Sequence, residues 1–217
     1  MESTLKSFEE IHDAYAYFQA HSTEAHECTQ ALLSELLRIV PQNQSWTLAD
    51  FGCGAGEFTD GLLKQCNFAP DLLSLILIEP DPSYRNTASQ RLSGFTKNPI
   101  VTKPTLTTHD FPSPAADILL SNHVLYYVSD LNQTLNSLQA AIKPNGTLLI
   151  SLANRTNALL QGWDFLFGLF GEKCPRPVLL ALQSHLSPSS SDVPVRCRPG
   201  YRSGGRVLQQ CQQSIFA

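Results

Sequence analysis

Apolar residues recur at steps of three and four along the first part of the chain, which is the spacing of an amphipathic helix. After a polar break at 21–23, the same spacing returns from about residue 24 and stops before Pro41. Ser22 or Thr23 is placed to cap this second helix. The apolar positions of the first helix are Leu5, Phe8, Ile11, Tyr15 and Phe18. The chain is therefore predicted to begin with two helices.

From residue 46 the pattern changes to short, continuously apolar runs that alternate with amphipathic stretches. Continuous apolar runs are typical of strands that are buried on both faces, as in a parallel sheet. Alternation of strand and helix, with right-handed connections, predicts a doubly wound α/β sheet. The predicted strands cover 46–51, 72–79, 100–103, 116–122 and 146–152, the predicted helices cover 57–66, 82–94 and 131–142, and a turn is predicted at 143–146.

This periodicity is lost after residue 152. The segment 154–171 is predicted to form a helix or a lid, and no segment after 185 has the pattern of a strand. The charge changes as well: residues 1–173 carry 10 Lys and Arg against 18 Asp and Glu, whereas residues 174–217 carry 5 Arg and one Asp. We therefore expect one domain over 1–173, including the N-terminal helices, and an irregular or disordered basic tail over 174–217. A short irregular cap on the sheet edge is the alternative for this tail.

Composition narrows the class of protein. The 217 residues are enough for one α/β domain with a substantial core. A formal net charge of -4 gives no reason to expect nucleic acid or an anionic membrane as a partner. The longest apolar runs are too short to span a membrane, and the polar N-terminus does not resemble a signal peptide. None of the six cysteines forms a C-x-x-C pair, which argues against a zinc site. We expect a cytoplasmic protein whose cysteines are kept reduced.

The most informative motif follows the first predicted strand of the sheet. Gly52, Gly54 and Gly56 form a turn between this strand and the next helix. Glycines suit a turn of this kind because a side chain would block a ligand that lies on the backbone. Glu79 ends the second strand, and in an open α/β sheet ligands bind at the carboxyl ends of the strands. A carboxylate there can accept hydrogen bonds from both hydroxyls of a ribose, so the motif predicts a cofactor that contains a nucleoside.

The spacing of the glycines favours one such cofactor over another. The turn has the form G-x-G-x-G, whereas dinucleotide sites have G-x-G-x-x-G. Glu57, at the start of the following helix, would compete with a pyrophosphate for the same backbone N–H groups. S-adenosylmethionine contains ribose and adenine without a phosphate, and its positive sulfonium suits an acidic pocket. A dehydrogenase is therefore a less favoured alternative.

Four segments resemble the successive motifs of the class I S-adenosylmethionine-dependent methyltransferases: "LADFGCGAGEF", "LILIEPDPS", "ADILLSNHVLYYVSDL" and "IKPNGTLLISL". The resemblance covers about residues 46–152 and implies a Rossmann-like, mostly parallel sheet. The residues that the resemblance places on the cofactor are Gly52, Gly54, Glu79, Tyr84, Asp110 and Asn122. For two of them another interpretation is equally consistent with the sequence: Tyr84 could be a half-exposed residue of a helix, and Asp110 could be a residue that favours a turn.

A narrower resemblance overlaps the first. "FQAHSTEAHEC", "HVLYYVSDL" and "GWDFLFGLFG" are similar, in this order, to segments of the histamine N-methyltransferases. Glu24 matches a carboxylate that contacts the amine, although a glutamate in the first turn of a helix needs no substrate. His123 stands where that family has a glutamine, and Tyr127 and Phe167 are also consistent with core positions. The substrate residues implied are Glu24, His123, Tyr126, Tyr127, Trp163 and Phe167.

Together these resemblances imply methyl transfer from S-adenosylmethionine to a nitrogen of a small amine, histamine or a related imidazole compound, by a monomer that needs no metal. The chain also departs from the family. Class I methyltransferases have seven strands, of which the last two form an antiparallel hairpin, and only five strands are predicted here. The alternative is therefore a truncated, weakly active or inactive variant that binds the cofactor or acts by interaction.

Overall fold

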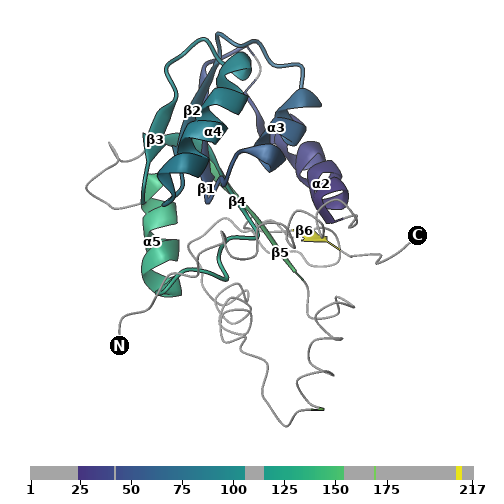
Figure 1. The fold of residues 1–217 in the computed structure, drawn as a ribbon. Helices are drawn as coiled ribbons and strands as arrows, with labels where there is room; N and C mark the ends of the chain where they lie inside the picture. Colours follow the sequence, from purple (N-terminus) through teal and green to yellow (C-terminus); the bar gives the residue numbers. More distant parts are fainter. Residues whose placement is uncertain (1–23, 42, 106–114, 154–168, 170–208, 212–217) are drawn as a thin grey trace.

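The core of the protein is a single parallel sheet (Figure 1). The computed structural model describes residues 24–41, 43–105, 115–153, 169 and 209–211. The six strands lie in the order β3-β2-β1-β4-β5-β6, and every neighbouring pair is parallel. The strands are β1 (Trp46–Phe51), β2 (Leu73–Ile78), β3 (Val101–Lys103), β4 (Ala116–Asn122), β5 (Ile142–Ala153) and β6 (Gln209–Cys211). The predicted α/β class and parallel sheet are confirmed.

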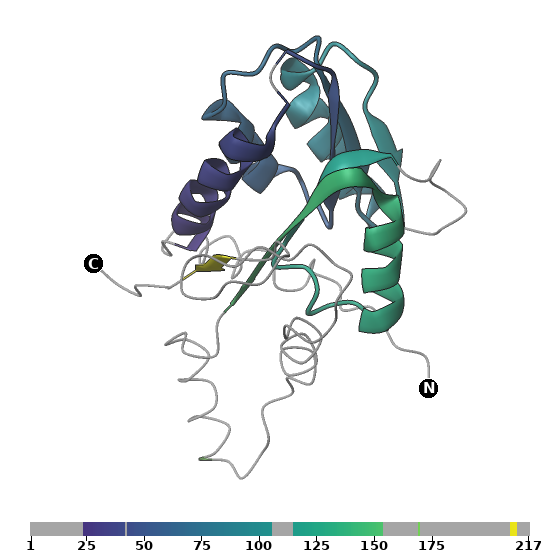
Figure 2. The ribbon, with the colours of Figure 1, turned by 180° about the vertical axis from the view of Figure 1, so that it is seen from behind.

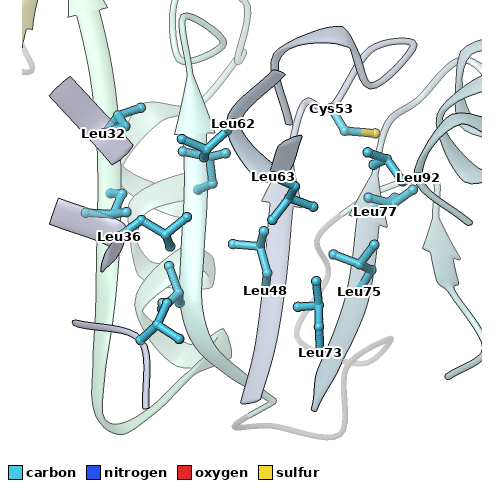
Figure 3. Packing of buried hydrophobic residues seen from close by; sticks show 14 of the residues in the cluster. Leu32, Leu36, Leu48, Cys53, Leu62, Leu63, Leu73, Leu75, Leu77 and Leu92 are labelled. Carbon is cyan, nitrogen blue, oxygen red and sulfur yellow. The ribbon is translucent and has the colours of Figure 1, made fainter. Parts of the chain in front are cut away.

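Helices cover both faces of this sheet. They are α2 (Glu24–Ile39), α3 (Glu57–Lys64), α4 (Pro82–Leu92) and α5 (Leu131–Ala141), and a short 3-10 helix, η2 (Ser93–Phe95), extends α4. Alternate residues of each strand point to opposite faces. Leu48 of β1 belongs to the cluster that α2, α3 and α4 cover, whereas its neighbour Ala49 belongs to the cluster beneath α5 (Figures 2 and 3). The sheet is therefore doubly wound, as its continuously apolar strands predict.

Most predicted elements are found within a residue or two of their expected ends. The helix expected from Pro82 begins there, because the carboxylate of Asp81 accepts hydrogen bonds from the backbone N–H groups of Ser83 (2.7 Å) and Tyr84 (3.1 Å). The first predicted helix and the segment 154–168 lie outside the described residues.

Two expectations about the carboxyl-terminal half are wrong. A strand does form after residue 185: Gln209–Cys211 pairs in parallel with β5, where Ser151 lies opposite Gln209. Three residues are too few for an apolar pattern to reveal them. Residues 143–146, expected to form a turn before the strand, instead lie within β5, which begins at Ile142. Ala116 of β4 lies opposite Ile142, and Ile118 lies opposite Thr147, so the register between the two strands shifts here. These residues form a bulge in which Asn145 adopts a left-handed backbone with φ 71°.

The start of β4 is tied to β1 through one carboxylate, and this contact makes a testable prediction. Asp117 Oδ2 accepts from the backbone N–H of Thr47 (2.8 Å) and from the Lys143 ammonium (2.7 Å). We expect Asp117→Ala to lower the free energy of unfolding by about 1–3 kcal/mol, because it leaves a backbone donor unsatisfied. Lys143→Ala should cost less than about 1 kcal/mol, since the ion pair is partly exposed to solvent. Urea unfolding of both variants measures the difference, and equal losses would contradict this assignment.

Candidate functional site

The carboxyl ends of three neighbouring strands meet at one edge of the sheet. Phe51, the last residue of β1, lies opposite Ile78, the last residue of β2. On the other side, Asp50 of β1 lies opposite Leu120 of β4. The glycine turn that follows β1 is therefore placed between Glu79, which follows β2, and His123, which follows β4. This is the edge where open α/β sheets bind ligands.

The glycine turn uses backbone conformations that other residues rarely adopt. Gly52 and Gly54 have φ values of 74° and 53°. A Cβ placed on Gly52 would lie only 2.1 Å from Val124 Cγ2, so this glycine is needed for close packing against the loop after β4. A Cβ placed on Gly54 would meet no atom of the described residues within 4 Å, so among these residues the backbone of Gly54 borders open space. The turn thus combines one tightly packed glycine with one that is accessible to a ligand.

The crowding at Gly52 predicts the effect of a small substitution. We expect Gly52→Ala to weaken cofactor binding at least tenfold, because the methyl group forces the Val124 side chain and the turn apart. Val124→Ala alone is the matched control, since it removes the side chain that the methyl group would meet and leaves the glycine turn unchanged, so its Kd should stay close to that of the wild type. The double variant Gly52→Ala/Val124→Ala should recover part of the binding measured by calorimetry. No recovery would mean that the clash with Val124 is not the cause.

Glu79 is held by the turn it faces. Its Oε2 accepts a hydrogen bond from the backbone N–H of Gly54 (3.1 Å), and its Oε1 accepts one from Asp81 N–H (3.0 Å). Each carboxylate oxygen has a second lone pair and can still accept a bond from a ligand hydroxyl. The Arg85 guanidinium donates to the carbonyl oxygens of Glu79 and Pro80 and supports the same backbone. The carboxylate is therefore fixed beside the accessible Gly54.

A second carboxyl group lies buried beneath the turn. Asp50 is 4% exposed, and burial raises its pKa to about 7. The Thr59 hydroxyl donates to Asp50 Oδ2 (2.5 Å) and opposes this rise, whereas the negative charge of Glu79 adds to it. Burial also raises the pKa of the neighbouring Cys53 thiol, so this thiol stays protonated and is no nucleophile. The sequence alone predicts no role for Asp50 or Thr59. The one local signal is that Asp50 is a polar residue near the end of an apolar strand.

The end of β4 brings Asn122 and His123 to the same edge. The Oδ1 atom of Asn122 is buried and has no hydrogen-bond partner among the described residues. His123 adopts a left-handed backbone with φ 54°, and its N–H donates to the carbonyl of Ser151 on β5 (3.0 Å). Its Nε2 lies 3.2 Å from Ser151 Oγ and 3.4 Å from the sulfur of Cys28 on α2. Neither Ser151 nor Cys28 is predicted from the sequence to lie at this site, although Ser151 is a polar residue near the carboxyl end of a predicted strand.

Aromatic side chains continue from His123. The Tyr126 ring stacks on the imidazole with centroids 6.2 Å apart and packs edge to face against Tyr127. Tyr127 is 47% exposed, which excludes the alternative that it is a core residue. Tyr84 is half-buried in the first turn of α4. Glu24 is the first residue of α2, but its side chain is not among those that the structure describes. Asp110, Trp163 and Phe167 also lie outside the described residues.

Other details of the sequence analysis change with the structure. The carboxylate of Glu57 does not cover the backbone N–H groups of the turn but pairs with the Arg91 guanidinium (2.8 Å) on the surface. The expectation that the cysteines are all reduced is wrong at Cys28, which is disulfide-bonded. Within the described part of the chain, no group of three or more His, Cys, Asp and Glu side chains could hold a metal ion. No described helix combines the length and the apolar character that crossing a membrane requires.

Comparison with known proteins gives a family. A family model described as a methyltransferase domain matches residues 24–183, more than half of the chain. Two curated relatives are both named ubiquinone biosynthesis O-methyltransferase. The one from Bradyrhizobium diazoefficiens is 30% identical over 107 residues, 49% of this chain and 39% of the relative. The one from Rhodopseudomonas palustris is 28% identical over 109 residues, 50% of this chain and 40% of the relative. The match therefore spans about two fifths of the length of these relatives.

Solved structures share the fold at low sequence identity. One from Methanococcus maripaludis, described provisionally as an S-adenosyl-L-methionine-dependent methyltransferase, has a TM-score of 0.55 at 15% identity and covers 89% of this chain and 91% of its own. Another from Thermotoga maritima, described as a possible histamine N-methyltransferase, has a TM-score of 0.53 at 16% identity, with 82% and 77% covered. Both agree with the doubly wound sheet.

Proposed function

Because this chain belongs to the methyltransferase-domain family, we propose that it is an enzyme that transfers the methyl group of its cofactor, S-adenosylmethionine, to a small acceptor molecule. The observation that carries the proposal is the contact between Glu79 and the glycine turn. A carboxylate that is fixed by Gly54 N–H, beside backbone bordering open space, is suited to a ribose that lies on the turn.

The residues at this edge fit the cofactor by their chemistry. Glu79 keeps lone pairs for two hydroxyl groups, and Gly54 leaves room for a ligand on the backbone. The Oδ1 of Asn122, which has no partner in the part of the chain that the structure describes, is a buried acceptor that a donor group of the ligand would satisfy. We therefore assign Gly52, Gly54, Glu79 and Asn122 to the cofactor, with Tyr84 beside them. Asp110 is kept as a candidate from the sequence alone.

When bound, S-adenosylmethionine supplies a methyl group that its positive sulfonium already activates. The chain has only to align an acceptor with this group and to keep the attacking atom unprotonated. His123 stands at the carboxyl end of β4 with an imidazole that donates or accepts a hydrogen bond. Tyr126 stacks on this imidazole, and Tyr127 extends the aromatic surface into solvent. These side chains are suited to orient a flat ring or a cation.

For the acceptor we propose a nitrogen of a small amine, histamine or another imidazole compound. The support is the aromatic surface beside His123 together with the resemblance of Glu24, Trp163 and Phe167 to substrate residues of the histamine N-methyltransferases. A hydroxyl acceptor is the second candidate, because the curated relatives are named O-methyltransferases. His123 would then accept the proton that a hydroxyl loses on methylation.

Two measurements test this function in order. Calorimetric titration of the full chain with S-adenosylmethionine should show saturable binding, and titration with NAD should show none. The loaded protein is then incubated with histamine and, separately, with a catechol, and methylated products are measured by mass spectrometry. Methylated histamine supports the nitrogen acceptor, whereas methylated catechol alone would replace it with a hydroxyl acceptor. Binding without any product would favour the alternative of an inactive variant that retains its cofactor.

Other properties stay predictions of the sequence. We propose a monomer without nucleic-acid partners, which size-exclusion chromatography coupled to light scattering would test. A cytoplasmic location is also a prediction, and the disulfide at Cys28 weighs against it because disulfides are rare in reducing compartments.

A further inference from the structure

We propose that Arg91 of α4 is a positioning residue for the cofactor: its guanidinium holds the Ala55 carbonyl and so keeps the glycine turn where Gly54 N–H reaches Glu79. That this turn binds S-adenosylmethionine rests on the proposed function, whereas the hold of Arg91 on the turn does not. None of the sequence motifs points to Arg91, because it lies 36 residues away from Ala55 along the chain.

Gly54 and Ala55 are the two central residues of the turn. The turn is closed by the N–H of Gly56, which donates to the carbonyl of Cys53 (2.9 Å). Gly54 has a φ of 53°, in a region that glycine adopts without a steric cost. The internal hydrogen bond sets the shape of the turn but not its distance from Glu79, which follows another strand. That distance depends on contacts from outside the turn.

Side chains supply such contacts from two sides. On one side, the N–H of Gly54 donates to Glu79 Oε2 (3.1 Å). On the other side, Arg91 Nε donates to the carbonyl of Ala55 (2.9 Å), while its Nη2 donates to Glu57 Oε1 (2.8 Å). The first contact of Arg91 is with the backbone of the turn, and the second is with an exposed side chain of α3. Arg91 therefore fixes the residue next to Gly54.

The face of α4 that carries Arg91 packs directly against the turn. A Cβ placed on Gly56 would lie 3.1 Å from Ala88 Cα and 3.2 Å from Ala88 Cβ, and Ala88 is fully buried. Arg85 and Arg91 lie three residues to either side of Ala88, so the three share one face of the helix. From this face Arg85 donates to the carbonyl of Glu79. One helix therefore holds both the glycine turn and the residue that faces it.

Charge and geometry predict opposite effects of removing Arg91. S-adenosylmethionine carries one net positive charge, because its sulfonium and ammonium groups are opposed by a single carboxylate. Loss of a neighbouring cation therefore favours its binding electrostatically. Loss of the contact with Ala55 releases the turn and weakens binding. A weaker Kd consequently reports on the position of the turn and not on its charge.

Calorimetric titration of the full chain tests the proposal. Arg91→Met keeps the aliphatic stem and removes the donors, and we expect its Kd for S-adenosylmethionine to be about tenfold weaker. Glu57→Ala is the matched control, since it removes the ion pair, leaves the contact with Ala55, and should stay within about twofold of the wild type. An unchanged Kd in Arg91→Met, or equal weakening in both variants, would overturn the proposal. If Arg91→Met does not fold, Arg91→Ala takes its place under the same criteria.

Amide exchange tests the hold on the turn without any cofactor. In 15N NMR of the full chain, we expect Gly54 N–H to exchange with water about tenfold faster in Arg91→Met than in the wild type, while Leu120 N–H, inside the sheet, keeps its rate. An unchanged rate at Gly54, or equal acceleration at Leu120, would overturn the positioning role. A wild type that binds no S-adenosylmethionine, together with the expected acceleration at Gly54, would refute the proposed function and leave the role of Arg91 standing.

Kinetics separate positioning from chemistry. Because Arg91 acts through the turn, KM for S-adenosylmethionine should rise about tenfold in Arg91→Met, while kcat at saturating cofactor changes less than twofold. A fall in kcat with an unchanged KM would contradict the proposal.

Discussion

Replacing Glu79 with alanine is expected to weaken binding of S-adenosylmethionine by about a hundredfold or more. A hydrogen bond to a charged group contributes about 1.5–3 kcal/mol, and the carboxylate can accept from two ribose hydroxyls. Loss of both bonds exceeds the 2.8 kcal/mol or so that correspond to a hundredfold change in Kd. The variant also leaves the backbone N–H groups of Gly54 and Asp81 without their acceptor, so the turn itself loosens. Calorimetric titration of the purified variant measures the loss.

A neighbouring carboxylate provides the matched control. Glu57 follows the same glycine turn but is exposed and pairs with Arg91, away from Gly54. Glu57→Ala should therefore leave the Kd within about twofold of the wild type, because exposed ion pairs contribute little. Glu79→Gln keeps one acceptor oxygen and should fall between the two variants. Wild-type affinity in Glu79→Ala, with an intact melting transition, would show that the cofactor does not lie on this carboxylate.

The second large effect concerns pH and the buried carboxyl group of Asp50. Burial raises the pKa of Asp50 in the folded protein from 3.8 to about 7. Below about pH 4, both the folded and the unfolded chains hold this proton, and the group's contribution to stability is complete. As the pH rises from 4 to 7, the unfolded chain loses the proton first, so stability falls by up to about 1.4 kcal/mol per pH unit. Above the folded pKa no further loss is expected.

Asp50→Asn removes this dependence while its amide oxygen can still accept from the Thr59 hydroxyl. We therefore expect the stability of the variant, relative to the wild type, to improve by about 3 kcal/mol between pH 4.5 and pH 7.5. Urea unfolding at four pH values measures this difference. Asp71→Asn, at an exposed carboxylate, controls for the removal of one negative charge. A difference between Asp50→Asn and wild type that is constant with pH would contradict the raised pKa.

The elements that the sequence predicts well are those whose burial is complete. The strand 116–122 is found with the expected bounds because Ile118, Leu119 and Leu120 form a buried apolar run that the polar residues Ser121 and Asn122 follow. The glycine turn and Glu79 are found where expected because a short turn between a strand and a helix leaves few other geometries. At these positions the local sequence pattern and the tertiary structure agree, so a single sequence is enough to predict these elements.

The features that the sequence leaves open depend on contacts between distant segments. Ser151 approaches His123 only because β5 pairs with β4, and no local pattern carries that information. The left-handed backbone of His123 is likewise imposed by its surroundings and not by its residue type. β6 is three residues long and pairs with a strand far away in sequence. The burial of Asp50 could be anticipated, but its raised pKa depends on the desolvation that the fold produces.

The order of strands in the sheet also bears on how the chain reaches its native state. β1, at the middle of the sheet, pairs with β2, the next strand along the chain, but also with β4, where Thr47 and Asp117 are 70 residues apart. Closing a longer loop costs more entropy, and contacts between distant residues slow folding. The β1–β2 pair is therefore expected to form early, and β4 to join it in a later and slower step. The edge that holds Glu79, the glycine turn and His123 exists only after that step, so a nascent chain acquires its binding edge late.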